Sequence, residues 1–447
     1  MSSPVPDAAA APAVRRATLA AWAVFAVFFA NGFTFATWAA RLPAVRDGLG
    51  FSEAQMGLLV LTGAIGSILA LPLSGMIVSR LGAARTVVAF SVVAAVGYGL
   101  ACIGVVQEAP LMVRAGLFVA GVGIGVWDAS MNLEGAVVEQ RLGRAIMPRF
   151  HAGFSFGTVA GAGVAAAASG LHVPFAVHVI AGMVLAVVTA AVCVRWFVST
   201  PAGGGTATDR GTGADPATAV HVGAHDGSHD GAHGDAHDGA LGDAPHGIRD
   251  TLATWREPRT LLIGLVVLAA ALTEGAANDW VGLAVVDGFG EPEAVGAVAL
   301  AVFLAAMTGA RLVGTELIDR LGRVPVLRLS SVAALVGVGV FVFAPWLWLA
   351  IVGVIVWGAA AALGFPMGMS AASDDPRRAA LRVSVVSTIG YSAFFVGPAL
   401  IGFLAEHTGY RQALLVIAVP VVIGLLVAGA ARPLPTAAGN APSTLDR

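Results

Sequence analysis

Two short stretches, "SRLGAAR" at residues 79–85 and "DRLGRVP" at residues 319–325, decide how this chain is organised. They share an Arg-Leu-Gly core, lie 240 residues apart, and each follows the second long apolar run of its part of the chain. Pairs of tryptophans repeat at similar spacing. Features that recur in this way indicate two structurally related halves. The tryptophan pairs are Trp38 with Trp280 and Trp127 with Trp357.

The composition indicates a membrane protein. Hydrophobic residues make up 57% of the 447 residues and charged residues 12%, whereas a soluble globular protein has about 25% charged residues. The mean hydropathy is +0.84. Since a helix needs about 20 apolar residues to cross the hydrocarbon, we expect an all-α membrane protein with twelve transmembrane helices in two pseudo-symmetric six-helix bundles. The expected spans are 17–40, 53–79, 86–106, 111–138, 150–170, 175–197, 260–286, 295–318, 326–344, 346–371, 383–405 and 412–430.

The positions of the basic residues, all 25 of which are arginine, predict the topology. Cytoplasmic loops carry an excess of basic residues. With the N-terminus in the cytoplasm, the outer loops contain only Arg41, Arg46 and Arg411. The absence of lysine and the abundance of Ala, Gly and Val indicate a bacterial source. We therefore expect a multi-pass protein of the bacterial cytoplasmic (inner) membrane with both termini in the cytoplasm. The arginines placed inside are Arg80, Arg85, Arg141, Arg144, Arg149, Arg320, Arg323, Arg328, Arg377, Arg378 and Arg432.

Compositional changes divide the chain into a disordered cytoplasmic N-terminus (1–16), a first bundle (17–197), a disordered cytoplasmic linker (198–258), a second bundle (259–431) and a cytoplasmic tail (432–447). The linker has too few large apolar residues to fold. Its histidines recur at every fourth position, but its glycines disfavour the helix that would align them. We interpret it as a solvated low-complexity segment, with incidental or regulatory metal binding as the alternative. These histidines are His221, His225, His229, His233 and His237.

Twelve spans, a long central loop and an Arg-Gly turn after the second and eighth spans resemble the major facilitator superfamily. The loop signature of that family runs approximately Gly-x-x-x-Asp-Arg-x-Gly-Arg. The copy "GMIVSRLGAAR" at 75–85 has Ser79 in place of the Asp, and the copy "TELIDRLGR" at 315–323 has Thr315 in place of the Gly. The resemblance implies that the loop charges take part in gating ion pairs. The residues concerned are Arg80, Arg85, Asp319, Arg320 and Arg323.

Four longer stretches resemble a bacterial subgroup of inner-membrane permeases akin to the fucose permeases and to a rhizopine-linked membrane protein. They are "WAARLPAVRDGLG" (38–50), "WDASMNLEGAVVEQRLGRAIMPRFHAGFSFG" (127–157), "EGAANDW" (274–280) and "MTGARLVG" (307–314). By analogy with the family, spans one, four, seven and ten line a central cavity.

An acid and an amide interrupt the fourth span. Asp128 and Asn132 are four residues apart and share a helix face. An acid at mid-membrane costs about 2.5–3.5 kcal/mol unless it is paired or protonated. Fucose permeases carry an acid and an Asn at this spacing, and the resemblance implies that Asp128 couples transport to protons. They also carry an Asp late in span one, where this chain has Ala39, so Glu274 in span seven is the second candidate. The alternative for Asp128 is a buried structural hydrogen bond.

Other charges in or near the spans have less specific interpretations. Arg311 in span eight needs a partner, for which Asp128 and Glu274 are candidates, or it reaches the cytoplasmic surface or pairs with Glu316. Glu134 and Glu139 are expected mainly in interfacial ion pairs, with an inner gate as the alternative for Glu134. His151, at the edge of span five, is a gate or loop hydrogen-bonding residue, or a proton relay.

Aromatic and amide side chains supply candidate substrate contacts. Tryptophan rings can stack on sugar rings, and amides can bind hydroxyl groups. Packing within the protein is the alternative for each tryptophan. For Trp280 and its neighbour Asp279, which lie nearer the outer surface, an outer gate or interfacial anchor is a further alternative. The candidates are Asn31, Trp38, Trp127, Asn132, Asn278, Trp280 and Trp357.

The leading functional hypothesis is proton-coupled import of a small hydroxylated solute such as a sugar, polyol or inositol derivative. A proton-driven exporter of drugs or metabolites is the alternative. Exporters of the superfamily that this chain resembles often carry a Gly-Pro signature in span five and, in span four, an Arg followed four residues later by a Gly. Span five of this chain has no proline, and Arg114 is followed at that spacing by Phe118, so both absences disfavour export. We find no nucleophile–base pair or phosphate-binding loop, and no metal site within the spans, so we expect neither an enzyme nor a cofactor. The expected partners are the solute, protons and the lipid bilayer, not nucleic acid. The resemblance to the major facilitator superfamily implies a monomer.

Overall fold

The computed structural model describes residues 10–143, 146–198, 252–375 and 378–434. Within these residues the chain is folded into helices joined by short turns, without strands. Twelve helices of the described part are long and apolar enough to cross a membrane, which confirms the predicted fold class. The linker histidines, the start of the N-terminal segment and the end of the tail lie outside the described residues.

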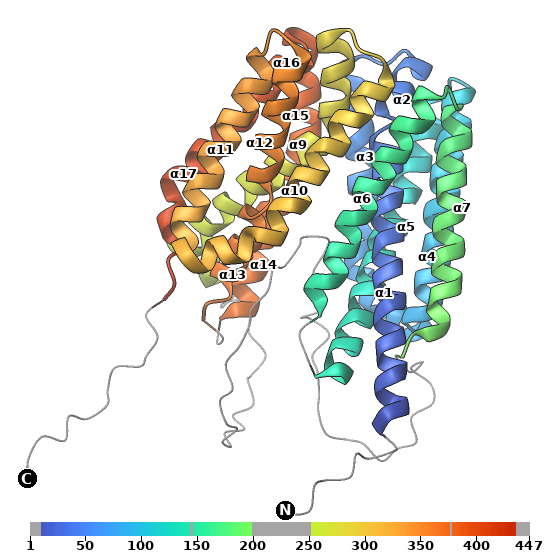
Figure 1. Cartoon of the computed structure of the whole chain (residues 1–447), viewed down its shortest axis with the longest axis vertical. Helices are drawn as coiled ribbons and strands as arrows, with labels where there is room; N and C mark the ends of the chain where they lie inside the picture. Colours follow the sequence, from blue (N-terminus) through green and yellow to red (C-terminus); the bar gives the residue numbers. More distant parts are fainter. Residues whose placement is uncertain (1–9, 144–145, 199–251, 376–377, 435–447) are drawn as a thin grey trace, which may run out of the picture.

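The N-terminal half forms the first six spans (Figure 1). The first span ends in a short helix, α2. This helix has Pro43 in its first turn and ends at Gly50, whose backbone is in the left-handed conformation. In chain order the elements are α1 (Ala10–Ala39), α2 (Leu42–Leu49), α3 (Glu53–Leu81), α4 (Ala83–Val106), α5 (Pro110–Leu142), α6 (Met147–Gly170), α7 (Phe175–Cys193) and η1 (Val194–Trp196).

The C-terminal half forms the other six spans, and its last three spans are each built from more than one helix. In chain order the elements are α9 (Pro258–Phe289), α10 (Glu293–Leu321), α11 (Arg323–Phe343), α12 (Leu347–Ala361), α13 (Gly364–Ala372), α14 (Ala379–Tyr391), α15 (Ala393–Thr408), α16 (Tyr410–Ala413), η3 (Leu414–Ile417), α17 (Ala418–Val427) and η4 (Ala428–Ala431).

The turns of the two halves repeat one another. Gly50 and Gly290 end the first spans of the two halves with φ of 60° and 69°, and Gly82 and Gly322 end the next spans with φ of 79° and 82°. The members of each pair are 240 residues apart. Residues other than glycine rarely adopt these positive φ angles. The internal repeat seen in the sequence therefore extends to the backbone conformation.

The two halves touch at one end of the molecule. In Figure 1 this upper end carries α2 and α16, and α1 begins at the opposite, lower end. Helix α6 packs against α10, and α3 packs against α15, across the boundary between the halves. The ribbons of the two halves meet at the upper end and diverge toward the lower end (Figure 1).

Charged side chains join the halves at the upper end. Arg41 Nε lies 2.7 Å from a carboxylate oxygen of Glu293. The Ser169 hydroxyl donates to the other oxygen of Glu293 at 2.8 Å. Arg46, on α2, forms an ion pair with Asp287 of α9. The first and fifth spans are thus held to the seventh and eighth spans by ion pairs and hydrogen bonds.

Glycine allows α3 and α15 to approach closely at this end. A Cβ atom added at Gly57 would lie 2.4 Å from the carbonyl oxygen of Pro398, and one added at Gly402 would lie 2.7 Å from the carbonyl oxygen of Glu53. Both contacts are to backbone atoms, which cannot move aside as a flexible side chain can. Any larger residue at these positions must push the two halves apart.

Gly57→Ala should therefore open the upper end, because relieving the overlap costs about 1–3 kcal/mol when the helices stay in contact. The Ser52 hydroxyl lies 3.3 Å from the Glu406 carboxylate in the closed arrangement. Cysteines placed at these two positions should cross-link readily in the parent protein and several-fold more slowly after Gly57→Ala. The measurement is the yield of cross-linked protein with time.

The matched control is Gly75→Ala, on the same helix, where an added Cβ would meet nothing within 4 Å. Both variants are made in a background from which Cys102 and Cys193 have been removed. Equal cross-linking rates in the Gly57 and Gly75 variants would contradict the role of Gly57 in closure.

Candidate functional site

Asp128 lies on α5, where the N-terminal half faces the C-terminal half. Its side chain is buried, with 7% exposed. It interacts electrostatically with the phenol of Tyr391 on α14. The Asn132 amide nitrogen donates to the backbone carbonyl of Asp128 at 2.9 Å. At this four-residue spacing the Asn132 side chain therefore bonds to the main chain of Asp128. One acid of the N-terminal half therefore interacts with a residue of the C-terminal half.

Arg311 pairs with Glu274, one of the candidate partners left open by the sequence. Its Nη2 atom donates to Glu274 at 3.0 Å, and the two side chains are only 13% and 25% exposed. Glu316, another candidate partner, instead pairs with Arg320 on an exposed part of α10. In this conformation the Glu274 carboxylate thus serves as the counter-ion of an arginine.

A helix break explains the second contact of Arg311. Pro366 has no backbone N–H, so the carbonyl of Ala362 lacks its usual partner four residues later, and the span changes from α12 to α13 at this point. Arg311 Nε donates to that carbonyl at 3.2 Å. The guanidinium therefore holds together α9, α10 and the broken tenth span.

Most of the predicted substrate-binding residues carry buried polar atoms that have no hydrogen-bond partner within the described part of the chain. Three are amide atoms and two are indole nitrogens. Since an unpaired buried polar atom costs about 1–3 kcal/mol, these atoms are suited to bind a polar solute or water. The atoms are Asn31 Nδ2, Asn132 Oδ1, Asn278 Oδ1, Trp127 Nε1 and Trp280 Nε1.

The other two tryptophans have partners in the protein. Trp357 Nε1 donates to the carbonyl of Thr273 at 3.1 Å. Trp38 packs against Tyr98, with 5.2 Å between ring centroids, and against Phe175. Both rings are at least 92% buried. In this conformation they have the packing role, and ligand contact by either remains a prediction.

Two acids near the lower end of α5 contact the backbone. Glu134 is fully buried and accepts a hydrogen bond from Val198 N–H at 2.5 Å. Glu139 accepts from two backbone N–H groups at the start of α6, each at 2.7 Å. Glu139 therefore caps the start of α6, and its expected interfacial ion pair stays a prediction. His151 is buried, and its ring lies 5.2 Å from that of Phe28.

The two loop-motif copies differ in their contacts. Arg80 and Arg85 of the first copy are exposed, as are Asp319 and Arg320 of the second. Arg323 is instead partly buried. It donates to both carboxylate oxygens of Asp374 at 3.0 and 3.1 Å and to the Ser370 hydroxyl at 3.1 Å. Arg259 also pairs with Asp374, at 2.7 Å.

Asp374 was not identified from the sequence, although it forms part of the acidic pair "DD" at 374–375, just before two arginines. Glu257, at the start of α9, is the centre of a second cluster of charged side chains, in which it pairs with Arg378 and Arg382. Burial alone would raise the pKa of Glu257, but hydrogen bonds from Arg382, Thr260 and Arg378 outweigh it and hold the pKa below its usual range. This carboxylate therefore stays ionised and ties α9 to α14.

The comparison with known families identifies the chain. The family model described as the Major Facilitator Superfamily matches residues 23–398, with a second match at residues 263–446. The chain belongs to the Major Facilitator Superfamily. Members of this superfamily are transporters rather than enzymes, so this is a multi-pass membrane transporter of small molecules.

Curated relatives of this superfamily member match along most of their length. A Yersinia pestis protein described as an uncharacterized MFS-type transporter is 28% identical over 406 residues, which cover 91% of this chain and 93% of the relative. Membrane protein MosC of Rhizobium meliloti is 25% identical over 407 residues, covering 90% of this chain and 86% of MosC. The resemblance to a rhizopine-linked permease group thus has support from the sequence comparison.

Solved structures share the superfamily fold. The nucleoside transporter NupG has a TM-score of 0.70 at 15% identity, covering 92% of this chain and 98% of NupG. The N162A variant of the E. coli fucose:proton symporter FucP has a TM-score of 0.57 at 13% identity, covering 93% of this chain and 98% of that chain. At these identities the likeness establishes the fold alone.

Glu274→Gln should destabilise the transporter by about 3 kcal/mol, because it leaves the Arg311 guanidinium in the membrane without its counter-ion. Adding Arg311→Gln should recover much of this loss, since the unpaired charge is then removed. Thermal unfolding in detergent measures both effects. Glu316→Gln is the matched control on α10, because its exposed pair with Arg320 contributes about 0–1 kcal/mol. A Glu274→Gln loss no larger than that of the control would contradict the pairing.

Proposed function

We propose that this protein is a proton-coupled symporter that imports a small hydroxylated solute, such as a sugar, polyol or inositol derivative, by alternating access. It acts as a monomer in the bacterial cytoplasmic membrane, with both termini in the cytoplasm. In this orientation the upper end is the outer end. The structure, in which the two halves meet at the upper end, then corresponds to the inward-facing conformation.

The unpaired amide and indole atoms carry the proposal. They come from both halves: Asn31 on α1, Asn132 on α5 and Asn278 on α9 belong to three of the four spans that line the cavity in this family. A hydroxyl group both donates and accepts hydrogen bonds, so a polyhydroxylated solute can satisfy amide oxygens and nitrogens alike. For a charged solute, we would expect the site to contain unpaired charged side chains instead of these amides.

Asp128 supports proton coupling. A carboxyl group that is buried at this depth is costly when ionised, and its neighbour across the boundary between the halves is the neutral phenol of Tyr391. A group in this position can take up a proton from one side and release it on the other as the halves move. Glu274 is less suited to this task in the present conformation because Arg311 holds it as a counter-ion.

The names of similar proteins agree with a solute of this class. One solved relative in fold is a nucleoside transporter and another is a fucose:proton symporter. Both nucleosides and fucose present several hydroxyl groups, and the second protein is named for proton symport. These names support the class of solute and the coupling ion without specifying the solute.

Asp128→Asn should abolish proton uptake driven by solute while leaving the folded protein in the membrane, because an amide cannot carry the proton. Cells that express the protein are suspended in weak buffer, sugars, polyols and inositol derivatives are added singly, and the external pH is recorded. Alkalinisation with one solute is expected in the parent and in Glu108→Gln, an exposed acid outside the site, and is absent in Asp128→Asn.

Alkalinisation that persists in Asp128→Asn would remove Asp128 from the coupling mechanism. The absence of a response to every solute would favour proton-driven export, and the next measurement would be efflux from preloaded vesicles.

A further inference from the structure

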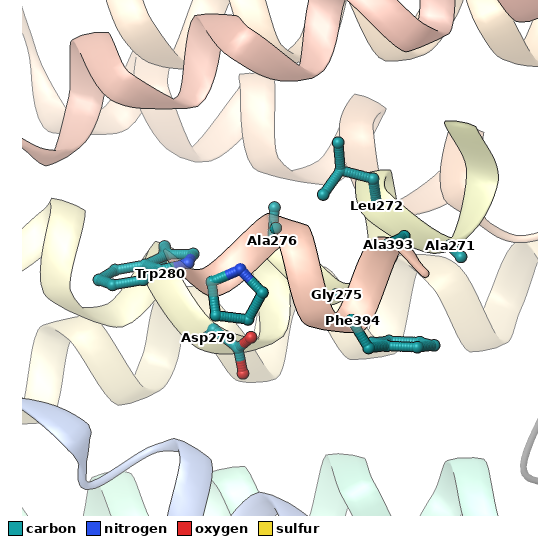
Figure 2. A pocket seen from close by; sticks show the side chains of 10 residues that line it. Ala271, Leu272, Gly275, Ala276, Asp279, Trp280, Ala393 and Phe394 are labelled. Atoms are coloured by element: carbon teal, nitrogen blue, oxygen red, sulfur yellow. The ribbon is translucent and has the colours of Figure 1, made fainter. Parts of the chain in front are cut away.

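A small pocket beside the seventh span contains an acid that the coupling mechanism above does not use. The pocket lies between α9 and α15. Asp279 and Trp280 line it from α9. Figure 2 shows them on the same stretch of helix, with Ala393 and Phe394 of α15 nearby.

The pocket offers Asp279 no partner. Within the described part of the chain, its carboxyl group has neither an ion pair nor a hydrogen bond, and the remainder of the lining is apolar apart from the indole nitrogen of Trp280. That nitrogen is also unpaired. The Asp279 side chain is partly buried. An ionised carboxyl group among apolar neighbours without a counter-charge is costly, and adding a proton removes most of that cost.

The charged groups nearest along α9 are neutralised by other residues. Glu274, on the lower side of Asp279, pairs with Arg311 of α10. Asp287, on the upper side, pairs with Arg46 of α2. No opposite charge is therefore left on these elements to stabilise the Asp279 carboxylate.

Titratable groups on the neighbouring elements are also engaged elsewhere. Arg411 of α16 donates to the carbonyls of Val342 and Ala344 at 2.7 and 2.6 Å. The Tyr410 ring of α16 packs against Trp280, and Tyr391 of α14 interacts with Asp128. At the upper end of α15, Glu406 accepts a hydrogen bond from Ser52, and His407 contacts the carbonyl of Phe403. Helices α12, α13 and α17 contain no titratable residue.

One wall of the pocket belongs to the contact that closes the upper end. Gly397 and Pro398 of α15 line the pocket, and the carbonyl oxygen of Pro398 is the atom that a Cβ at Gly57 would meet at 2.4 Å. The segment of α15 beside Asp279 therefore packs directly on α3 when the halves are together. Opening the upper end must change the surroundings of this carboxyl group.

We propose that Asp279 is a proton-binding site whose occupancy permits the upper end to close. When the upper end is open, the carboxylate can be hydrated and takes up one proton from the outer solution to become a neutral carboxylic acid. Closure then seals a neutral group into the pocket. Without the proton, closure would have to desolvate a carboxylate that has no counter-charge. The inference rests on the alternating-access transport proposed above and adds a second proton site to Asp128.

The test measures the distance between spin labels at the upper end of the two halves as a function of pH, with no solute present. Cysteines for labelling replace Leu171 and Trp346, which are 77% and 59% exposed, in a background without the native cysteines. The short, closed distance should dominate at pH 5 and give way to a longer one toward pH 9. Binding of one proton changes the ratio of the two populations by at most about tenfold per pH unit.

Two substitutions assign the effect to the carboxyl group. Asp279→Asn, a neutral group of the same shape, should keep the short distance at every pH. Asp279→Glu, which still titrates, should retain the pH dependence and guards against a loss caused by misfolding. The exposed control Glu108→Gln should behave as the parent does.

A parent distance that does not change with pH would overturn the proposal, as would a pH dependence that survives in Asp279→Asn. A shift driven by sodium chloride at fixed pH, in place of potassium chloride, would also overturn it, because the site would then bind Na⁺. Since this measurement needs no solute, its outcome is separate from the external pH assay. If the symport proposal fails, a distance change that depends on Asp279 can still be observed. If solute-driven alkalinisation is observed but the distance does not depend on Asp279, only the proposal for Asp279 is overturned.

Discussion

The structure depends on the rule that polar groups in the hydrocarbon must find their partners within the protein. The tenth span shows how far this constraint reaches. Pro366 removes one backbone donor, the carbonyl of Ala362 loses its helical partner, and Arg311 supplies the replacement at 3.2 Å. Arg311 is itself tolerated because Glu274 neutralises it. One proline thus accounts for a helix break, and the arginine that repairs it is held by an ion pair between α9 and α10.

The same rule gives meaning to the groups that break it. Asn31, Asn132 and Asn278 keep buried amide atoms without partners in the described part of the chain, whereas Trp357 and Glu139 have theirs. A protein that only needed stability would replace unpaired amides with apolar residues. Their presence on spans from both halves is better explained by a polar ligand that is present for part of a transport cycle.

Close contact between the halves at the upper end relies on small residues and on charge pairs. Gly57 and Gly402 allow α3 and α15 to meet backbone to backbone, and Glu293 bridges Arg41 and Ser169 nearby. Contacts of this kind can separate and re-form without rearranging a packed core. They therefore fit the alternating-access transport proposed above, in which the halves move as rigid bodies with their own interiors unchanged.

The sequence by itself determined the membrane class, the twelve spans, the two repeated halves and the superfamily, because these follow from apolar run length and from motif spacing along the chain. It also limited the partner of Arg311 to a few acids, but it left Asp128 and Glu274 equally open. Only the tertiary structure decided for Glu274, since pairing depends on which helices are adjacent and how each is rotated about its axis. For the same reason the sequence assigned Asp279 no coupling role and missed Asp374. Whether an acid has a counter-charge is a property of its neighbours in space, and those neighbours come from distant parts of the chain.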